Sequence, residues 1–583
     1  MNQSLNVIID DSLDIKSNTH KIYIHPYFQS IKEQEQSTIL NYHWEDYSKL
    51  KKDYSYLNEL QFKLTNKIGE FLNTFHNTDH SNKYWKILIG SWLHRYCVSI
   101  FDRWEMTTSL LNLNKNITIE LKKYFEKDML PQSTDELNNL SFLNDYNAYL
   151  FSKILDHRFS KNKNFSIILR DVKPENFFLN KLKFRQKPNL KYKLLKIYNF
   201  AFSKKLRNQK FVLLRTYLGK KELFKLNFKL LQIPNFIPNN YYNCEPDIDL
   251  RKKIKINFHT DNSFEKFLIN NIFLFLPVSY LEGYQIEKKK IHQLSLPSNP
   301  KKIFSSNILN KSLLTRYCAD KTENGSKLIL GTHGGSYGHY DLHFYEKHEI
   351  EISDQYLTWG WKNKAISKVT PFGIIRPQIK FFKKKKTNKL TIIIPAMTVF
   401  EEKIESHISL IKNKKFIFEP VFKILDNLDS GLKKKNILLR FYNRNFGCNE
   451  FEIFNKKYPS INKDKMEMKF DKLLSETKIF LSPYLGTGYL ETLSLNIPTI
   501  VFNSKDNSYL IRDDAKEHYE NLKKVKIFFD DEKQLANHIN NVWNDVDSWW
   551  KGHDVQKIVK DFCKEYAHKN DNKIKDLKNL LIN

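Results

Sequence analysis

The second half of the chain contains a series of short, uninterrupted apolar segments, which constrain the fold more than any other feature. These segments are LTIIIPAM (390–397), ILLRFYNR (437–444), TKIFLSPY (477–484), TIVFN (499–503) and VKIFF (525–529). A strand that is buried on both faces of a parallel sheet is apolar at successive positions. Because the spacing leaves room for a helix between consecutive strands, we predict a parallel α/β unit over residues 385–535.

A similar alternation precedes this unit. The strand-like segments are FSIILRD (165–171), KFVLLRTYL (210–218), IFLFLP (272–277) and KLIL (327–330), and residues 305–325 have a helical pattern. A lysine run at 383–386 separates the two parts. The sequence therefore predicts an α/β fold of two Rossmann-like domains, 1–384 and 385–535, that face each other across a cleft.

Helical extensions are expected at both ends. The first 130 residues are predicted to be mainly helical, because apolar side chains recur every three or four residues between Tyr84 and Trp104. This apolar stripe is typical of core packing. Residues 536–583 are predicted to form C-terminal helices that pack across both domains.

The chain has a net charge of +30, which invites a nucleic-acid interpretation. However, the lysines accompany abundant Asn, Ile, Phe and Tyr and are spread along the sequence, whereas nucleic-acid binders concentrate basic residues on one face. We expect a solvated lysine-rich surface, with attraction to an anionic membrane surface or phosphorylated substrates as the main alternative. The five cysteines are far apart and form no CxxC pair, as is typical of a reducing cytoplasm.

No secretory signal is visible, and the most apolar stretch, 267–284, is interrupted by asparagines and a proline. We therefore expect a cytoplasmic protein that is soluble or peripheral on the inner face of the membrane.

The segment from Gly331 to Trp361 contains four of the 18 histidines and five of the 16 glycines. It follows the predicted strand KLIL, and ligands bind α/β sheets at the carboxyl ends of parallel strands. His333 lies in the tightest part of the turn, where an imidazole can take a proton from an acceptor hydroxyl. The alternative is a glycine-rich turn with a structural histidine.

A metal site is a further alternative for this segment. His339 and His343 are four residues apart and would share one face of a helix. Because no third ligand is fixed by the pattern, we predict no metal. Other residues that could bind substrate here, the glycines through their backbone, are Gly334, Gly335, Tyr337, His348, Glu349 and Asp354.

A second glycine loop lies in SPYLGTGYLETLSLNIPTIVF (482–502). Gly486 and Gly488 free the backbone, and Thr487 with the following helix N-terminus supplies donors for a phosphate. Glu491 lies one turn into that helix, where it can accept hydrogen bonds from vicinal hydroxyls such as those of a ribose. The pattern matches neither GxxxxGK[ST] nor GxGxxG.

Arg440 stands at the end of the predicted strand ILLRFYNR. A strand-end arginine aimed into a cleft is suited to a diphosphate. A salt bridge to a nearby acidic residue remains an equal alternative.

The combination GTHGGSYG and EKHEIEISDQYLTWGW resembles the signature of a family of transferases from bacterial surface-carbohydrate (O-antigen-type, leptospiral-type) gene clusters. Three other stretches resemble the same family in the same order: YWKILIGSWLHRYCVSIFDRW, YLETLSLNIPTIVF and the WW…F…YA tail. The resemblance covers most of the chain and is weakest between 105 and 260.

The late segment is also similar to the donor loop of two-domain (GT-B) glycosyltransferases, although Asn496 replaces the usual glycine before Ile497-Pro498. This likeness implies that Gly486, Thr487 and Gly488 hold donor phosphate and that Glu491 holds the ribose. Likeness to polymer glycerophosphotransferases implies that His333 is the general base. The implied partners are a nucleotide-sugar donor and a glycan or lipid-linked acceptor, with no further cofactor and no nucleic acid.

Three other functions stay open at this point. They are transfer of glycerol phosphate or ribitol phosphate from a CDP-linked donor, nucleic-acid binding through the net positive charge, and carbohydrate binding by an inactive relative.

Overall fold

The computed structural model describes most of the chain. The described ranges are 5–8, 21–24, 37–113, 116–171, 190–237, 243–309, 311–377, 388–396, 398–401, 403–405, 415–505 and 510–583. The lysine run at 383–386 lies outside them.

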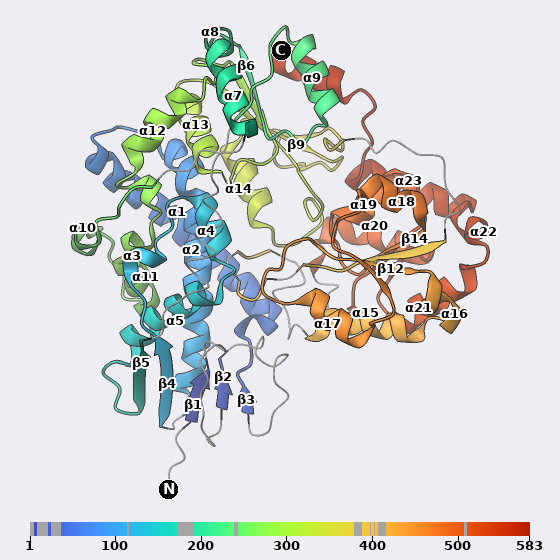
Figure 1. Ribbon diagram of the computed structural model, residues 1–583, viewed down its shortest axis with the longest axis horizontal. Helices are drawn as coiled ribbons and strands as arrows, with labels where there is room; N and C mark the ends of the chain where they lie inside the picture. The colour runs from blue at the N-terminus through green and yellow to red at the C-terminus, as the bar shows by residue number, and fades with distance from the viewer. Residues whose placement is uncertain are drawn as a thin grey trace.

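Three parallel sheets form the framework of the protein, and the predicted α/β class is confirmed (Figure 1). The first sheet has the order β3-β2-β1-β4-β5. Its strands are β1 (Leu5–Ile8), β2 (Lys21–Tyr23), β3 (Ser37–Ile39), β4 (Ile117–Lys122) and β5 (Phe165–Arg170). The prediction that the first 130 residues are mainly helical is confirmed by α1 (Tyr47–His76) and α2 (Asn82–Leu111), but it missed β1 to β4, which are too short to carry a strong period-two signal. Strand β5 coincides with the predicted segment 165–171.

The second sheet has the order β10-β9-β8-β7-β6. Its strands are β6 (Phe211–Leu214), β7 (Lys302–Ser305), β8 (Lys327–Gly331), β9 (Gln355–Thr358) and β10 (Val369–Pro371). Strands β6 and β8 coincide with predicted segments. The segment 272–277 was predicted as a strand and is instead the end of a helix, because a short apolar run alone does not distinguish a buried strand from a buried helix.

The third sheet has the order β13-β12-β11-β14-β15-β16, which is the 3-2-1-4-5-6 order of a Rossmann fold. Its strands are β11 (Lys389–Ile393), β12 (Ile437–Arg440), β13 (Asn462–Asp464), β14 (Thr477–Ser482), β15 (Thr499–Phe502) and β16 (Phe528–Phe529). Five of these strands fall within the apolar segments that the sequence analysis identified. The strand order reverses between β11 and β14, so the loop after β14 lies at the topological switch point.

Helices surround the first two sheets. They are α1 (Tyr47–His76), α2 (Asn82–Leu111), α3 (Glu126–Met129), α4 (Thr134–Leu140), α5 (Asn144–Phe159), α7 (Leu190–Ala201), α8 (Ser203–Arg207), α9 (Lys220–Lys229), α10 (Ile248–Lys253), α11 (Ser263–Phe275), α12 (Tyr284–Gln293), α13 (Ser312–Glu323) and α14 (Phe344–Ile352). Helix α2 packs against α1, α5, α11, α13 and α14, and its predicted apolar stripe is buried in the core. Helix α13 begins later than the predicted 305, because residues 302–305 form β7.

The remaining helices belong to the third sheet and the C-terminus. They are α15 (Lys415–Asn427), α16 (Ser430–Lys435), α17 (Glu450–Lys457), α18 (Phe470–Glu476), α19 (Thr487–Ser494), α20 (Asp513–Lys524), α21 (Glu532–Val542), α22 (Val546–Trp550), α23 (His553–Tyr566) and α24 (Lys573–Ile582). Helix α23 packs on α19 and α20, and α24 packs on α9. The amide of Ile374 donates a hydrogen bond to the carbonyl of His568 over 2.8 Å, so the tail contacts both halves of the protein.

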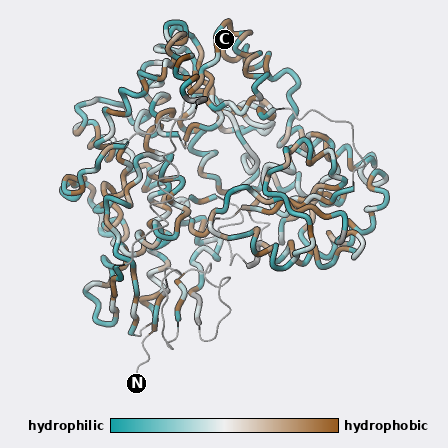
Figure 2. Tube along the Cα trace, in the orientation of Figure 1, coloured by the Kyte–Doolittle hydropathy of each residue, from teal (hydrophilic) through white to brown (hydrophobic). Residues whose placement is uncertain are grey.

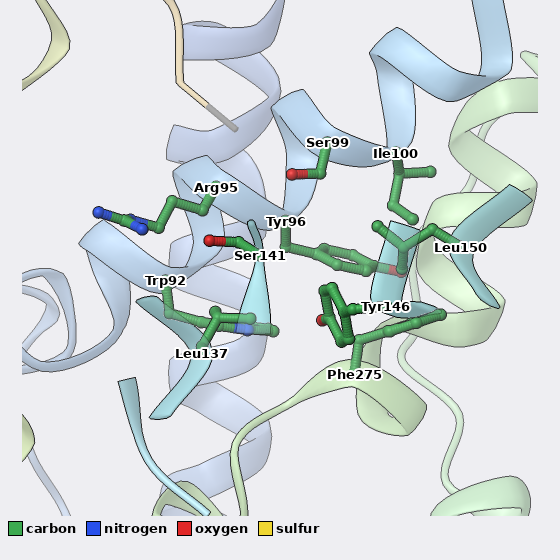
Figure 3. Close-up of a pocket in the computed structure, with 10 residues that line it drawn as sticks. All are labelled: Trp92, Arg95, Tyr96, Ser99, Ile100, Leu137, Ser141, Tyr146, Leu150 and Phe275. Atoms are coloured by element: carbon green, nitrogen blue, oxygen red, sulfur yellow. The ribbon is translucent and has the colours of Figure 1, made fainter. Parts of the chain in front are cut away.

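A cavity of about 20 Å³ lies beside α2, between Trp92, Tyr96, Tyr146 and Phe275 (Figure 3). It has room for about one water molecule and cannot admit a sugar. Across the described ranges, no helix combines the length and the apolar character that crossing a membrane requires.

Candidate active site

The carboxyl ends of β6 and β8 lie next to the N-terminus of α19. The loop of His333 follows β8, and Tyr217 follows β6. Arg215 and Tyr217 both adopt positive φ angles, of 42° and 59°. Residues other than glycine rarely adopt a positive φ angle, because it is strained for them. Backbone strain of this kind is concentrated at functional sites. The second and third sheets thus meet through their strand-end loops.

The two predicted glycine loops touch each other. The amide of Gly335 donates a hydrogen bond to the Thr487 hydroxyl over 2.8 Å. A Cβ atom at Gly335 would lie 2.3 Å from the carbonyl oxygen of Gly486, so only glycine permits this approach. Gly334 is also close, since a Cβ there would lie 3.1 Å from the Thr487 hydroxyl. The contact between the second and third sheet units therefore involves four of the predicted site residues, namely Gly334, Gly335, Gly486 and Thr487.

His333 is surrounded by polar and aromatic groups. Its Nδ1 lies 3.2 Å from the Tyr337 hydroxyl and 4.0 Å from Oε1 of Glu349. The hydroxyl of Tyr356 donates to the other oxygen of Glu349 over 3.1 Å. One face of the imidazole is stacked on Tyr217, with ring centroids 5.7 Å apart. The side chain keeps a quarter of its surface exposed.

Burial shifts the pKa values of both His333 and Glu349. Desolvation, together with the nearby His343 and Lys403, lowers the pKa of His333 to about 4, so the imidazole is neutral at pH 7. Desolvation also raises the pKa of the Glu349 carboxyl well above its usual range. A neutral imidazole can accept a proton. The raised pKa of Glu349 favours its uncharged form, so this carboxyl gives little charge stabilisation to an imidazolium.

Glu491 on α19 is linked to His333 through two residues that the sequence analysis missed. Arg376 Nη1 forms a salt bridge with Glu491 Oε1 over 3.1 Å. The same guanidinium lies 5.8 Å from the centre of the Tyr217 ring, which stacks on His333. Burial raises the pKa of the Glu491 carboxyl, and Arg376 opposes this effect. Neither residue had a signal in the sequence, because Tyr217 lies inside the predicted strand segment 210–218 and no strand was predicted before Arg376.

Two further missed residues come from the segment after β11. Lys403 Nζ pairs with Glu405 over 2.8 Å, and Glu405 forms an isolated antiparallel bridge with His343. Both charges act on His333, Lys403 lowering its pKa and Glu405 raising it. They belong to the second half of the chain but lie beside the loop of the first.

Arg440 lies outside this cluster. It is buried and forms an ion pair with Asp464 on the neighbouring strand, and its Nη1 also donates to the carbonyl of Met468 over 3.0 Å. This is the salt-bridge alternative left open above, and it leaves the arginine bound within the third sheet.

Three other predicted site residues make contacts that support the fold. A Cβ at Gly488 would lie 2.7 Å from Ile393, so this glycine lets α19 pack on the sheet. Asp354 accepts a hydrogen bond from the amide of Leu328, at the amino end of β8 and therefore at the edge opposite His333. His348 is buried against Gly90 of α2, and it points away from the loop because Glu349, its neighbour on α14, faces His333.

The two histidines of the metal alternative do not share a helix face. Helix α14 begins after His343, whose Nδ1 accepts the amide of Glu346 as the helix cap. His339 is buried among Tyr340, Tyr489, Tyr519 and Tyr566. Within the described part of the chain, no three His, Cys, Asp or Glu side chains are grouped as metal ligands would be.

A cavity of about 140 Å³ opens at the carboxyl ends of β11 and β12. Its lining includes Tyr442, Arg444 and Lys465. Arg444 also donates to Asn139 of the first half over 2.9 Å. This cavity adjoins the switch point of the third sheet, where Rossmann-type sheets bind ligands.

Comparisons with known proteins place the chain in one family. A family model described as LIC12162 family transferase matches residues 19–581. No curated protein matches the sequence.

Three solved structures are similar to this chain at a distance. The Wall Teichoic Acid Polymerase TagF has a TM-score of 0.34 and 11% identity, over 67% of this chain and 96% of that chain. OtsA has a TM-score of 0.31 and 10% identity, over 54% and 80%. The Spinosyn Rhamnosyltransferase SpnG has a TM-score of 0.30 and 8% identity, over 79% and 99%. Likenesses this distant assign no residue and no substrate.

Proposed function

The chain belongs to the LIC12162 family of transferases, and from this premise we propose that it is a GT-B-like glycosyltransferase. In this proposal it moves a sugar from a nucleotide-activated donor to an acceptor in bacterial surface-polysaccharide biosynthesis. The observation that supports it is the linkage of His333 to Glu491, from separate sheet units, through Tyr217 and Arg376.

The general base in this proposal is His333. Its Nδ1 faces Tyr337 and Glu349, so Nε2 is the nitrogen that takes the proton from the acceptor hydroxyl. The acceptor oxygen then bonds to the anomeric carbon of the donor sugar, and the bond from that carbon to the nucleotide diphosphate breaks.

Arg376 is the cation that stabilises the leaving diphosphate. We assign this role to Arg376 rather than Arg440, because Arg440 is engaged with Asp464. A guanidinium and the amide groups at the N-terminus of α19 can neutralise charge on the departing phosphate. Glu491 accepts hydrogen bonds from the ribose of the donor, and it holds Arg376 until the donor binds.

The acceptor is proposed to be a glycan or a lipid-linked glycan at the inner face of the cytoplasmic membrane. The donor is the only nucleotide partner, and no nucleic acid takes part.

A donor panel followed by one histidine variant tests this function. Nucleotides, nucleotide sugars, CDP-glycerol and CDP-ribitol are added in turn, and the melting temperature reports binding. With the donor that binds, His333→Gln should lower turnover by at least about a hundredfold and change donor affinity little. His553→Gln, at an exposed histidine, is the matched control. Stabilisation by CDP-glycerol or CDP-ribitol and by no nucleotide sugar would overturn the proposal.

A further inference from the structure

Large apolar side chains are exposed along α7 and α9. Among the described residues, seven of the fifteen exposed large apolar side chains fall between residues 194 and 231. They are Leu194, Ile197, Phe200, Phe202, Phe224, Phe228 and Leu231. Phe200, Phe228 and Leu231 are 85%, 80% and 91% exposed. A cluster of this kind marks an interaction site more often than scattered apolar residues do.

The exposed side chains follow the helical period. On α9, Leu223, Leu226 and Leu230 pack inward on the second apolar core, whereas Phe224 and Phe228 are one turn apart on the outer face. On α7, Leu194, Ile197 and Phe200 are three residues apart on one face. Both helices therefore present an apolar stripe whose side chains remain more than half exposed within the described ranges.

The two helices are linked through one aromatic ring of the segment that follows α9. The ring of Phe236 is 5.2 Å from Tyr198 of α7 and 6.4 Å from Phe224 of α9, so this one ring joins them. In Figure 1 they stand next to each other near the C-terminus, and in Figure 2 the tube alternates between hydrophilic and hydrophobic colours along both. We call this surface, with its exposed residues between 193 and 231, the α7–α9 face.

The α7–α9 face is strongly basic. Between residues 193 and 231 the sequence has eleven lysines and arginines and one acidic residue, Glu222. All eleven basic side chains are exposed. Glu222 is engaged elsewhere, because it accepts from the amide of Gly219 over 2.9 Å and forms an ion pair with Lys573 over 2.8 Å. The face thus combines positive charge with apolar side chains that protrude into solvent.

We propose that the α7–α9 face docks the protein on the surface of an anionic lipid bilayer. Basic residues are attracted to acidic headgroups, and apolar side chains of an interfacial helix enter the boundary between headgroups and acyl chains. Single-stranded nucleic acid, the other anionic partner, is bound by aromatic rings that stack on bases. Four of the seven exposed side chains are phenylalanines, but Leu194, Ile197 and Leu231 have no ring that could stack on a base, whereas all seven can enter a lipid interface, so the composition favours lipid.

The face has firm support and lies close to the candidate active site. Helix α9 rests on α24, and Lys302 Nζ donates to the carbonyl of Leu580 over 2.7 Å to fix α24 on the second sheet. The cap of α9 is Gly219, two residues after Tyr217, which stacks on His333. Docking through this face would hold the His333 loop near the membrane, although the docking itself does not depend on the reaction.

Vesicle flotation with the full chain tests the proposal without any activity assay. Wild-type protein should float with vesicles that contain phosphatidylglycerol and stay behind with phosphatidylcholine alone. The triple variant Phe200→Ser/Phe228→Ser/Leu231→Ser should reduce the bound fraction by about tenfold or more. Lys225→Glu/Lys229→Glu should do the same through charge. Because all these side chains are exposed, the melting temperature should not change.

Matched controls lie elsewhere on the surface. Phe125→Ser/Leu169→Ser changes two apolar side chains that are 66% and 60% exposed, and Lys557→Glu/Lys560→Glu reverses two exposed charges on α23. Neither control should change the bound fraction by more than about twofold. The proposal is overturned if wild-type protein does not float, or if the controls lose as much binding as the test variants. It is also overturned if the triple variant still binds vesicles and loses only RNA binding, or still binds vesicles and loses only the self-association that light scattering detects.

Discussion

The amide of Gly335 donates a hydrogen bond to the hydroxyl of Thr487, 152 residues away in the sequence, over 2.8 Å. This bond joins the loop that carries His333 to the N-terminus of α19. The threonine hydroxyl is the acceptor in this bond, so its O–H can still donate to a phosphate of the donor. A donor that binds Thr487 would therefore contact a group that also holds the two sheet units together.

Gly335→Ala should weaken this contact. The added Cβ would lie 2.3 Å from the Gly486 carbonyl oxygen and 2.7 Å from the Thr487 nitrogen, so the backbones must separate. We expect the free energy of unfolding to fall by about 1–3 kcal/mol, as for other overpacked sites. Denaturant unfolding measures the change. Gly431→Ala, where no heavy atom lies within 4 Å of the new Cβ, is the control and should not destabilise the protein.

Tyr337→Phe should make His333 a less efficient base while leaving its imidazole in place. The Tyr337 hydroxyl lies 3.2 Å from Nδ1 of His333 and fixes which ring nitrogen carries the proton. We expect turnover to fall by about tenfold to a hundredfold with little change in donor affinity, and the acid limb of the pH–rate profile to move.

Tyr217→Phe is the matched control for that variant. It keeps the ring that stacks on His333 and removes only a hydroxyl that accepts from Asn307 over 3.1 Å. Equal losses in the two variants, with no movement of the acid limb in either, would contradict a positioning role for Tyr337.

The sequence predicted five of the six strands of the third sheet, because these strands are buried on both faces and their apolar runs recur at a spacing that leaves room for helices between them. It also identified the two loops that meet, since each follows such a strand. It could not show that Arg440 pairs with Asp464, because their contact depends on the register between β12 and β13. The same limit applies to Arg376, whose partner Glu491 lies on another sheet unit.

The sequence analysis also underestimated how strongly basic residues concentrate in one segment. We expected basic residues to be spread along the chain, but the segment 193–231 contains eleven against one acidic residue. A count by segment would have shown this excess. The exposure of Phe228, two residues after the buried Leu226, was harder to predict from the sequence. A helix with apolar residues on two faces has the pattern of a helix buried in the core.

Arg376→Ala should weaken donor binding more than it weakens the fold. The Arg376–Glu491 pair is partly exposed, so its loss should change the free energy of unfolding by less than about 1 kcal/mol. Loss of a cation at the leaving phosphate should lower kcat/KM by about a hundredfold, with partial recovery in Arg376→Lys. Transfer assays and thermal unfolding separate the two effects. Lys551→Ala, which breaks the exposed pair with Asp547, should affect neither measurement.

The stability of the protein should fall as the pH is lowered below about 6.5, partly because of His339. Burial among four tyrosine rings lowers the pKa of His339 to about 3, whereas an unfolded histidine titrates near 6.5. Between these values the unfolded chain binds a proton that the folded protein does not. The contribution of His339 is therefore complete above pH 6.5, and lowering the pH from 7 to 5 should cost about 2 kcal/mol.

His339→Phe keeps a ring among the tyrosines and removes the nitrogens that bind the proton. The free energy of unfolding, measured at several pH values, should then fall less steeply from pH 7 to 5 than in the wild type. Glu349, whose pKa is raised, titrates in the opposite sense, but it is present in both proteins and its effect cancels in the comparison. The control His553→Phe, at a residue exposed to solvent, should keep the wild-type slope. An unchanged slope in His339→Phe would mean that this histidine is protonated equally in the folded and unfolded chains.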